Sequence, residues 1–360
     1  MLRRIRKPTA RGRPSMTPNS APAAAAETDT DDFEAALLVL VRRVFPGTGA
    51  IGNLVRLSGG ASQETWAFEA IGTSPSPLRM ILRRSPPGYT APFRAAGIET
   101  EAALMQLAYQ AGVPSPLVRH VLAPQDNLGR GFLMDCVEGE TIPRKILRDD
   151  AFASIRPKLA FQLGGVLARI HAIDRTRLPK LRHVTAASEL NELKNAYKKD
   201  GQPRPVFDVA FRWLEERAPQ GVAHDTLVHG DFRNGNLMIG PDGVRAVLDW
   251  ELAHTGDPME DLGWICVNSW RFGHIDKPVG GFGEIADLAE GYRVAGGGNV
   301  DLDRIKYWEK FGSLRWGVMC LGMLARFTSG EDRSVERAVI SRRASENEID
   351  LLRLLAPRTR

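Results

Sequence analysis

Apolar and polar residues alternate in the first third of the chain, and this period of two predicts β-strands. Three such strands are expected, at residues 53–57, 65–71 and 78–83, with a turn of small residues at 58–63 between the first two. A fourth apolar run, residues 131–139, ends at glycine and predicts a strand followed by a turn. The chain therefore begins its folded part with a small sheet.

Further along, apolar residues recur every three to four positions, which is typical of amphipathic helices. One helix, residues 98–110, is expected between the third and fourth strands, and most others follow the last strand. The region 174–225 is polar and weakly periodic apart from one stretch. The remaining predicted helices are 31–43, 159–170, 206–217, 259–269, 283–295, 301–326 and 334–355.

The composition, with 43% hydrophobic and 25% charged residues, is that of an ordinary globular protein. The longest apolar stretches are interrupted by charge or glycine, so we expect no membrane span. Three widely separated cysteines, Cys136, Cys266 and Cys320, form no metal-ligand pair. We interpret them as buried free thiols of a cytoplasmic protein.

The net charge of +5 is concentrated at the N-terminus. Residues 1–26 contain six basic residues and no acidic one, so the rest of the chain is close to neutral. This balance gives no reason to expect nucleic-acid binding by the globular part. Residues 1–30 are predicted to be a disordered basic tail. A nucleic-acid or membrane arm, a transit peptide, or a start at Met16 are the alternatives for it.

The pattern with the most chemical content is His229-Gly230-Asp231, then Asn236, then Asp249. Asp231 can accept the proton of a substrate hydroxyl, and the oxygens of Asn236 and Asp249 suit Mg²⁺. Two short apolar runs flank a turn at residues 241–243, and a hairpin there would bring Asp249 beside Asn236. The alternative is that the aspartates cap turns and the histidine is a core residue.

Three segments, LVHGDFRNGNL, AVLDWELAHTGDPMEDLGW and LSGGASQETW, carry a resemblance to a known family. They resemble the aminoglycoside phosphotransferase-like small-molecule kinases, nearest to the branch associated with acyl-CoA dehydrogenases. The resemblance spans about residues 32–357. It implies an α+β, protein kinase-like fold of two lobes: an antiparallel-sheet N-lobe (31–135), a hinge (136–140) and a mostly helical C-lobe (141–357).

This resemblance implies ATP and Mg²⁺ as cofactors. The backbone of Gly59 and Gly60 could approach the phosphates, and Ser62 could add a hydroxyl contact. Kinases carry a lysine on the third strand that grips the α- and β-phosphates. Here Arg83 takes that position, which is a departure from the pattern, and Arg84 takes it if the register differs by one residue.

The acidic partner of this arginine can be chosen by helical periodicity. Glu101 lies on the apolar face of the 98–110 helix, whereas Glu99 lies on another face, so Glu101 is the expected partner. The alternative is a surface glutamate. The resemblance also implies that backbone groups near Asp135 and Val137 bind adenine, with Met134 beside it.

Around the loop, the resemblance assigns further roles. Arg233 stands where protein kinases often carry a lysine, and could stabilise the transferring phosphoryl group. Asp257 and Asp261 are expected to brace the catalytic loop by accepting backbone N–H bonds, and Asp257 has the alternative of reaching the metal. Only seven residues separate Asp249 from Asp257, which argues against regulation by a long activation segment.

The activity that follows is ATP-dependent phosphorylation of a hydroxyl on a small molecule. The insert 174–225 is rich in lysine and arginine, which favours an anionic acceptor such as a hydroxy acid or its CoA ester. Aminoglycoside, choline or homoserine kinases are alternatives, as is a non-catalytic nucleotide-binding module. No nucleic-acid or membrane partner is expected, and a functional association with an acyl-CoA dehydrogenase is implied.

Overall fold

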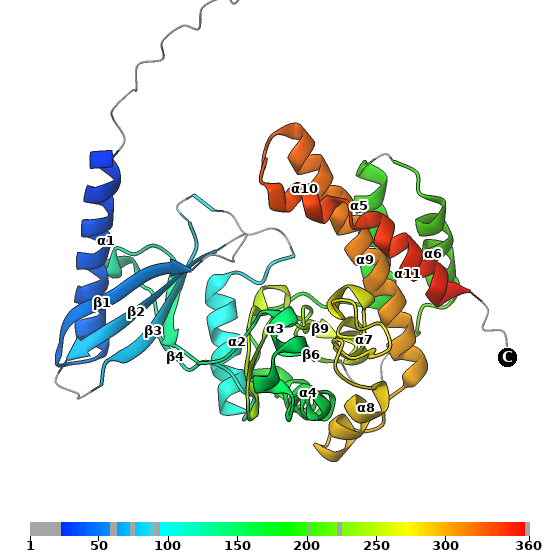
Figure 1. Cartoon of the computed structure of the whole chain (residues 1–360), viewed down its shortest axis with the longest axis horizontal. Helices are drawn as coiled ribbons and strands as arrows, with labels where there is room; N and C mark the ends of the chain where they lie inside the picture. The colour runs from blue at the N-terminus through cyan, green and yellow to red at the C-terminus, as the bar shows by residue number, and fades with distance from the viewer. Residues whose placement is uncertain are drawn as a thin grey trace, which may run out of the picture.

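The chain folds into two lobes, seen at the left and right of Figure 1. This computed structural model describes residues 23–57, 63–72, 76–86, 88–89, 94–200, 202–221 and 225–356. The N-terminal lobe contains a five-stranded sheet in the order β1-β2-β3-β5-β4, with antiparallel neighbours throughout. Its strands are β1 (Thr48–Leu57), β2 (Glu64–Gly72), β3 (Leu78–Arg84), β4 (Val118–Val121) and β5 (Gly131–Asp135). The expected two-lobed α+β architecture is confirmed.

Two helices pack on this sheet. Helix α1 (Ala23–Val44) places Leu37, Leu40 and Val41 in a small core with apolar residues of β2, β3 and β5. It begins at Ala23, so the prediction of disorder up to residue 30 is wrong for the last part of that segment; the alanine run there has high helix propensity. Helix α2 (Ile98–Gln110) has the predicted bounds.

The C-terminal lobe is mostly helical, as the periodicity predicts. Its two short sheets pair β6 (Thr226–Val228) with β9 (His254–Gly256), and β7 (Leu237–Gly240) with β8 (Gly243–Val247). Its helices are α3 (Pro143–Arg148), α4 (Leu159–His171), α5 (Ala186–Asp200), α6 (Pro205–Glu216), α7 (Met259–Trp264), α8 (Ile285–Val294), α9 (Leu302–Ser329), α10 (Val335–Ser341) and α11 (Ala344–Leu355).

The differences from the sequence prediction concern short or polar elements. Strand β4 and helix α5 were not predicted, because β4 has four residues and α5 is rich in lysine and glutamate. The single helix expected at 334–355 is two helices, α10 and α11, which end and begin around Arg343. Cys266 and Cys320 are buried free thiols as expected, but Cys136 is only half-buried.

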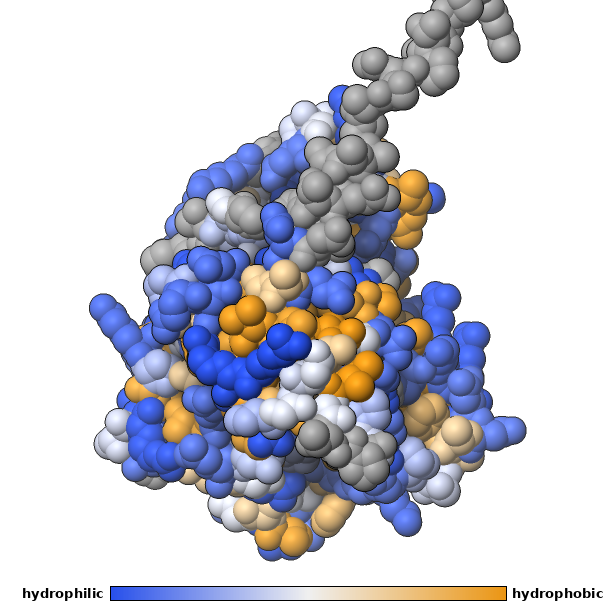
Figure 2. Space-filling model, turned by 90° about the vertical axis from the view of Figure 1, so that its left-hand side faces the viewer, coloured by the Kyte–Doolittle hydropathy of each residue, from blue (hydrophilic) through white to orange (hydrophobic). Residues whose placement is uncertain are grey.

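One outer face of the N-terminal lobe leaves apolar residues in contact with solvent. Figure 2 looks onto this side of the molecule and shows apolar side chains gathered among charged ones near its middle. Exposed large apolar residues on α1 and the first three strands are Val39, Val55, Leu57, Ile71 and Leu78. None of the described helices is long and apolar enough to cross a membrane.

Helices α4 and α8 approach each other so closely that only glycine fits at their contact. A Cβ added to Gly164 of α4 would lie 2.0 Å from the Leu288 carbonyl oxygen, and one added to Gly291 of α8 would lie 1.9 Å from the Phe161 carbonyl oxygen. These neighbours are backbone atoms, which cannot rotate away. The two glycines therefore set the distance between α4 and α8.

We expect Gly164→Ala to lower the free energy of unfolding by about 1–3 kcal/mol, because the helices must separate to admit the methyl group. Gly165→Ala is the matched control, since its added Cβ has no neighbour closer than 3.7 Å. Urea unfolding should show the control as stable as the wild type or slightly more stable. Equal loss in both variants would contradict the role of close packing at Gly164.

Candidate active site

The loop between β6 and β7 is held by one buried carboxylate. Asp261, on α7, is fully buried and accepts the backbone N–H groups of His229 at 2.8 Å and Gly230 at 2.9 Å. This bracing was predicted for Asp261 and is confirmed. Two fixed N–H groups immediately before Asp231 leave its backbone little freedom.

His171, at the end of α4, joins the same carboxylate from the other side. Its Nε2 lies 3.1 Å from Asp261 Oδ2, and its Nδ1 lies 3.0 Å from the Tyr292 hydroxyl. Burial raises the pKa of Asp261, but the attraction to His171 and the hydrogen bonds from His171 and the His229 backbone outweigh it, so the pKa is lowered from its ordinary value. These interactions favour the charged form of Asp261 at the base of the loop.

Beneath the loop, two further histidines are buried. The Nδ1 of His229 accepts the Asp231 N–H at 3.2 Å while its Nε2 donates to the Leu248 carbonyl at 3.1 Å, which fixes a neutral tautomer. Burial lowers the pKa of His229. His254 has acceptors at both nitrogens, the Leu252 carbonyl at 2.9 Å and Glu260 at 3.2 Å. Burial lowers the pKa of His254, but the Glu260 carboxylate outweighs it and the pKa is raised.

The Asp231 carboxylate receives hydrogen bonds from three side chains. The Asn236 amide donates to Oδ2 at 2.6 Å, and the Trp264 indole donates to Oδ1 at 2.8 Å. The Arg233 Nε lies 3.1 and 3.3 Å from the two oxygens. The carboxylate is thus held in one orientation and remains 14% exposed, so a ligand can reach it.

Arg233 also stacks on an aromatic ring, with its guanidinium carbon 4.7 Å from the centre of Trp270. Its positive charge therefore lies against Asp231 in the structure. The role that the sequence resemblance assigns to Arg233, at the transferring phosphoryl group, stays a prediction.

The predicted hairpin is present, and it returns the chain to the loop. Strands β7 and β8 pair from Leu237–Val247 to Gly240–Gly243, and the Leu248 N–H donates to the Asn236 carbonyl at 2.9 Å. Asp249 follows with a left-handed backbone, φ 66°, a conformation that few non-glycine residues adopt. Asn236 and Asp249 are therefore neighbours, as the spacing predicted.

The donor set at this point fits Mg²⁺. The Asn236 amide nitrogen is committed to Asp231, which leaves its amide oxygen without a described partner. Asp249 is 30% exposed, and among the residues that the structure describes only its Oδ1 has a hydrogen-bond donor. One carboxylate and one amide oxygen match the way proteins hold Mg²⁺ together with nucleotide phosphates.

Arg83 connects the two lobes at this site. From β3 it reaches Glu101 of α2 at 3.2 Å and Asp249 at 2.8 Å, so the expected Arg83–Glu101 ion pair is present. Arg84 instead pairs with Glu64, and Glu99 pairs with Arg130 at the surface. Neither Arg84 nor Glu99 therefore takes part in the ion pair at this site. Burial raises the pKa of Glu101 to about 7, although Arg83 lowers it.

Asp257 does not brace the loop, and this prediction is wrong. Its Oδ2 accepts hydrogen bonds from Arg304 at 2.7 Å and the Trp308 indole at 2.9 Å, while Oδ1 caps the Met259 N–H. Both oxygens are therefore occupied by α7 and α9. The alternative of a metal ligand is disfavoured as well, because both oxygens of Asp257 already accept hydrogen bonds.

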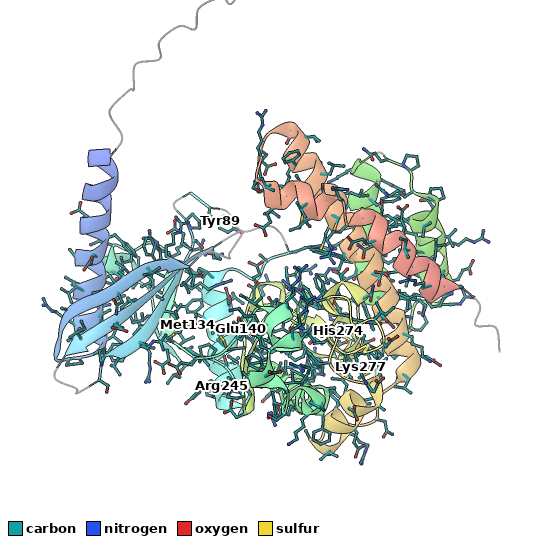
Figure 3. The ribbon with its side chains drawn as sticks, in the orientation of Figure 1. Tyr89, Met134, Glu140, Arg245, His274 and Lys277 are labelled. Atoms are coloured by element: carbon teal, nitrogen blue, oxygen red, sulfur yellow. The ribbon has the colours of Figure 1, made fainter. Side chains whose placement is uncertain are left out.

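The segment expected to hold adenine lies where the lobes join, around Met134 and Glu140 in Figure 3. The Asp135 N–H donates to the Leu117 carbonyl at 3.0 Å and is not available to a ligand. The backbone groups of Val137 make no hydrogen bond within the part of the chain that is described. Gly59, Gly60 and Ser62 lie outside the described residues.

Sequence reasoning missed Trp264 and His171 as partners of the loop. Trp264 lies one helical turn after Asp261, so both project from the same side of α7. This spacing was the available signal for Trp264. The sequence offered no such signal for His171. This residue lies about sixty residues before the loop, and only the packing of α4 brings it to Asp261.

Comparison with known proteins agrees with this geometry. A model of the phosphotransferase enzyme family matches residues 53–297, which contain the loop, the hairpin and the Arg83–Glu101 pair. The chain belongs to this phosphotransferase family.

Among sequence relatives, mouse acyl-CoA dehydrogenase family member 10 is 30% identical over 200 residues, which cover 52% of this chain and 18% of that protein. Rat acyl-CoA dehydrogenase family member 11 is 29% identical over 194 residues, which cover 51% of this chain and 24% of that protein. The chain thus spans only a minor part of the curated relatives it matches.

Solved structures share the fold at low sequence identity. A Ralstonia eutropha protein, provisionally named an aminoglycoside phosphotransferase, has a TM-score of 0.68 and 22% identity over 89% of this chain and 97% of that one. Spectinomycin phosphotransferase in complex with ADP and spectinomycin has a TM-score of 0.54 and 17% identity, over 90% of this chain and 94% of that one. These similarities establish the kinase-like fold and leave the acceptor open.

His254→Gln should change how stability depends on pH. Because the pKa of His254 is raised in the folded state, its attraction to Glu260 is complete below about pH 6.5 and is lost as pH rises through the folded-state pKa. The stability difference between wild type and variant should therefore be largest near pH 6 and shrink towards pH 9. His229, whose pKa is lowered in the folded state, changes stability with pH in the opposite direction. Its effect cancels in the difference because both the wild type and the His254→Gln variant contain it. A difference that grows with pH would contradict the assignment.

Proposed function

We propose that this protein is an ATP- and Mg²⁺-dependent phosphotransferase that phosphorylates a hydroxyl of a hydroxy acid or its CoA ester. The observation that carries the proposal is the Asp231 carboxylate, held by the Asn236 amide in a loop to which the hairpin returns Asp249. One carboxylate thus stands ready for an acceptor hydroxyl, and a second stands beside an amide oxygen that suits a metal–nucleotide complex.

In the proposed reaction, the acceptor oxygen attacks the γ-phosphorus, the bond from that phosphorus to the bridging oxygen breaks, and ADP leaves. Asp231 orients the hydroxyl and accepts its proton. The hydroxyl can take the place of one of the present donors to Asp231, and Arg233 makes the longest of these hydrogen bonds. Arg233, once displaced, can turn its charge to the phosphoryl group.

The nucleotide is proposed to lie between the lobes. Arg83, oriented by Glu101, grips the α- and β-phosphates, and its bond to Asp249 positions that carboxylate beside them. Asn236 and Asp249 would hold Mg²⁺, which when bound neutralises phosphate charge. Adenine would use the free backbone groups of Val137.

The backbone of Gly59 and Gly60 and the Ser62 hydroxyl are proposed to cover the phosphates. The resemblance to chains named as acyl-CoA dehydrogenase family members supports an acceptor with an acyl group, and a functional association with such a dehydrogenase. The direct test is to incubate the purified protein with ATP and Mg²⁺ and a panel of hydroxy acids, hydroxyacyl-CoAs, amino alcohols and aminoglycosides. Phosphorylated product would be identified by ³¹P NMR. Turnover of aminoglycosides alone would replace the proposal with a resistance activity.

Asp231→Asn and Asp249→Asn should each lower kcat by at least about a hundredfold, because one removes the proton acceptor and the other a metal ligand. The two variants should differ in Mg²⁺ dependence: only Asp249→Asn should need more Mg²⁺ for half-maximal rate. Asp242→Asn is the control, since this turn aspartate pairs with Arg245 at the surface. Full activity in Asp249→Asn would remove Asp249 from the site.

A further inference from the structure

The indole of Trp264 reaches the Asp231 carboxylate from helix α7, which lies outside the loop. Its N–H donates to Asp231 Oδ1 at 2.8 Å, and the residue is 4% exposed. An indole has one polar group, and this group can only donate a hydrogen bond. The whole hydrogen-bonding capacity of this buried side chain is therefore given to one oxygen of Asp231.

The other two donors to Asp231 have further tasks in the proposed reaction. Arg233, which lies beside both carboxylate oxygens, is the donor that the acceptor hydroxyl is proposed to displace. The Asn236 amide nitrogen holds Oδ2, while its amide oxygen is proposed to hold Mg²⁺. Trp264 has neither a charge nor a metal-binding atom, so holding Asp231 is its one task at the site.

Together, Trp264 and Asn236 hold the carboxylate at two points. The indole binds Oδ1 and the amide binds Oδ2, so rotation about the Cβ–Cγ bond of Asp231 would break these hydrogen bonds. Once Arg233 is displaced, loss of the indole N–H would leave Asp231 held through Oδ2 alone. A carboxylate that turns about this bond faces the acceptor hydroxyl for only part of the time, and proton transfer slows.

The indole ring is itself fixed by its neighbours. Gly312 of α9 lies against it, and a Cβ added to this glycine would come 2.9 Å from Trp264 Cε3. The Arg315 guanidinium carbon lies 4.9 Å from the centre of the ring, and the centre of the Trp270 ring lies 5.3 Å away. The direction of the N–H is therefore set by packing before any substrate binds.

We infer that Trp264 is a positioning residue for phosphoryl transfer that acts through the Asp231 carboxylate. Its N–H holds Oδ1 while Arg233 leaves and the acceptor hydroxyl enters, so the carboxylate keeps one orientation when it accepts the proton. The inference rests on the proposed phosphotransferase function and adds to it a residue that controls the rate through another side chain.

The first test replaces Trp264 by 3-benzothienylalanine, introduced at this one position by amber suppression. This residue has the shape of tryptophan with a sulfur atom in place of the N–H, so the packing is kept and the hydrogen bond is lost. With a hydroxyacyl-CoA or the free hydroxy acid as acceptor, we expect kcat to fall about tenfold. The KM values for ATP and for the acceptor should stay within about twofold. Raised KM values at an unchanged kcat would contradict a positioning role.

Trp264→Phe and Trp316→Phe form a matched pair of variants. Trp316 of α9 packs on the same neighbour, with its ring centre 5.0 Å from that of Trp270, and its buried indole nitrogen has no hydrogen-bond partner among the described residues. Both changes remove an indole, so both should lower stability. Only Trp264→Phe should lower kcat, again about tenfold. An equal fall of kcat in the two variants would trace the effect to disturbed packing and overturn the inference.

A double-mutant cycle tests whether Trp264 acts through Asp231. Asp231→Ala removes the acceptor of the indole N–H, so adding Trp264→Phe to it should change the residual rate by less than about twofold. A further tenfold loss in the double variant would show that Trp264 acts through a different group.

The outcomes separate the inference from the function it rests on. An active wild type whose kcat is unchanged by 3-benzothienylalanine overturns the role of Trp264 and leaves the phosphotransferase proposal standing. A wild type that phosphorylates no compound of the panel overturns both. If Trp264→Phe fails to fold, the 3-benzothienylalanine variant, which keeps the shape of the ring, still decides the question.

Discussion

The site depends on the buried ion Asp261. A carboxylate with no exposed surface is stable only when its oxygens are all engaged, and here two backbone N–H groups and His171 engage them. The backbone donors belong to the residues directly before Asp231. Because the anion cannot give up these hydrogen bonds without a large cost, the loop holds Asp231 in place before any substrate binds.

A second constraint is the shared use of Arg83. It is the one described side chain of the sheet that pairs with both α2 and the hairpin residue Asp249. Glu101 is buried among these charges, and its raised pKa shows how closely burial and attraction are balanced there. An arginine suits this position because its fork can serve two carboxylates at once, which a lysine ammonium does with less directional control.

Buried charges continue from the loop into the rest of the C-terminal lobe. Glu260, one residue before Asp261, contacts His254 under the loop and Arg315 of α9. Trp264, on the same short helix, contacts both Asp231 and Arg315. Helix α7 thus connects the loop to the long helix α9.

Local sequence determined much of the site. The hairpin between Asn236 and Asp249 follows from two apolar runs around a turn, and the choice of Glu101 over Glu99 follows from helical periodicity. Both depend on residues close together in the chain, where spacing alone fixes which side chains meet. Four of the five strands of the N-terminal sheet and most of the longer helices were predictable for the same reason.

Tertiary structure decided the partners that come from distant elements. Asp257 and Asp261 are four residues apart on one motif, yet Asp261 binds the loop before Asp231 whereas Asp257 binds Arg304 and Trp308 of α9. Likewise, nothing in the sequence indicates that Arg315 contacts Glu260 whereas Arg204 pairs with Glu348. Which acidic residue neutralises a given arginine depends on which helices pack against it, and that packing is a property of the whole fold.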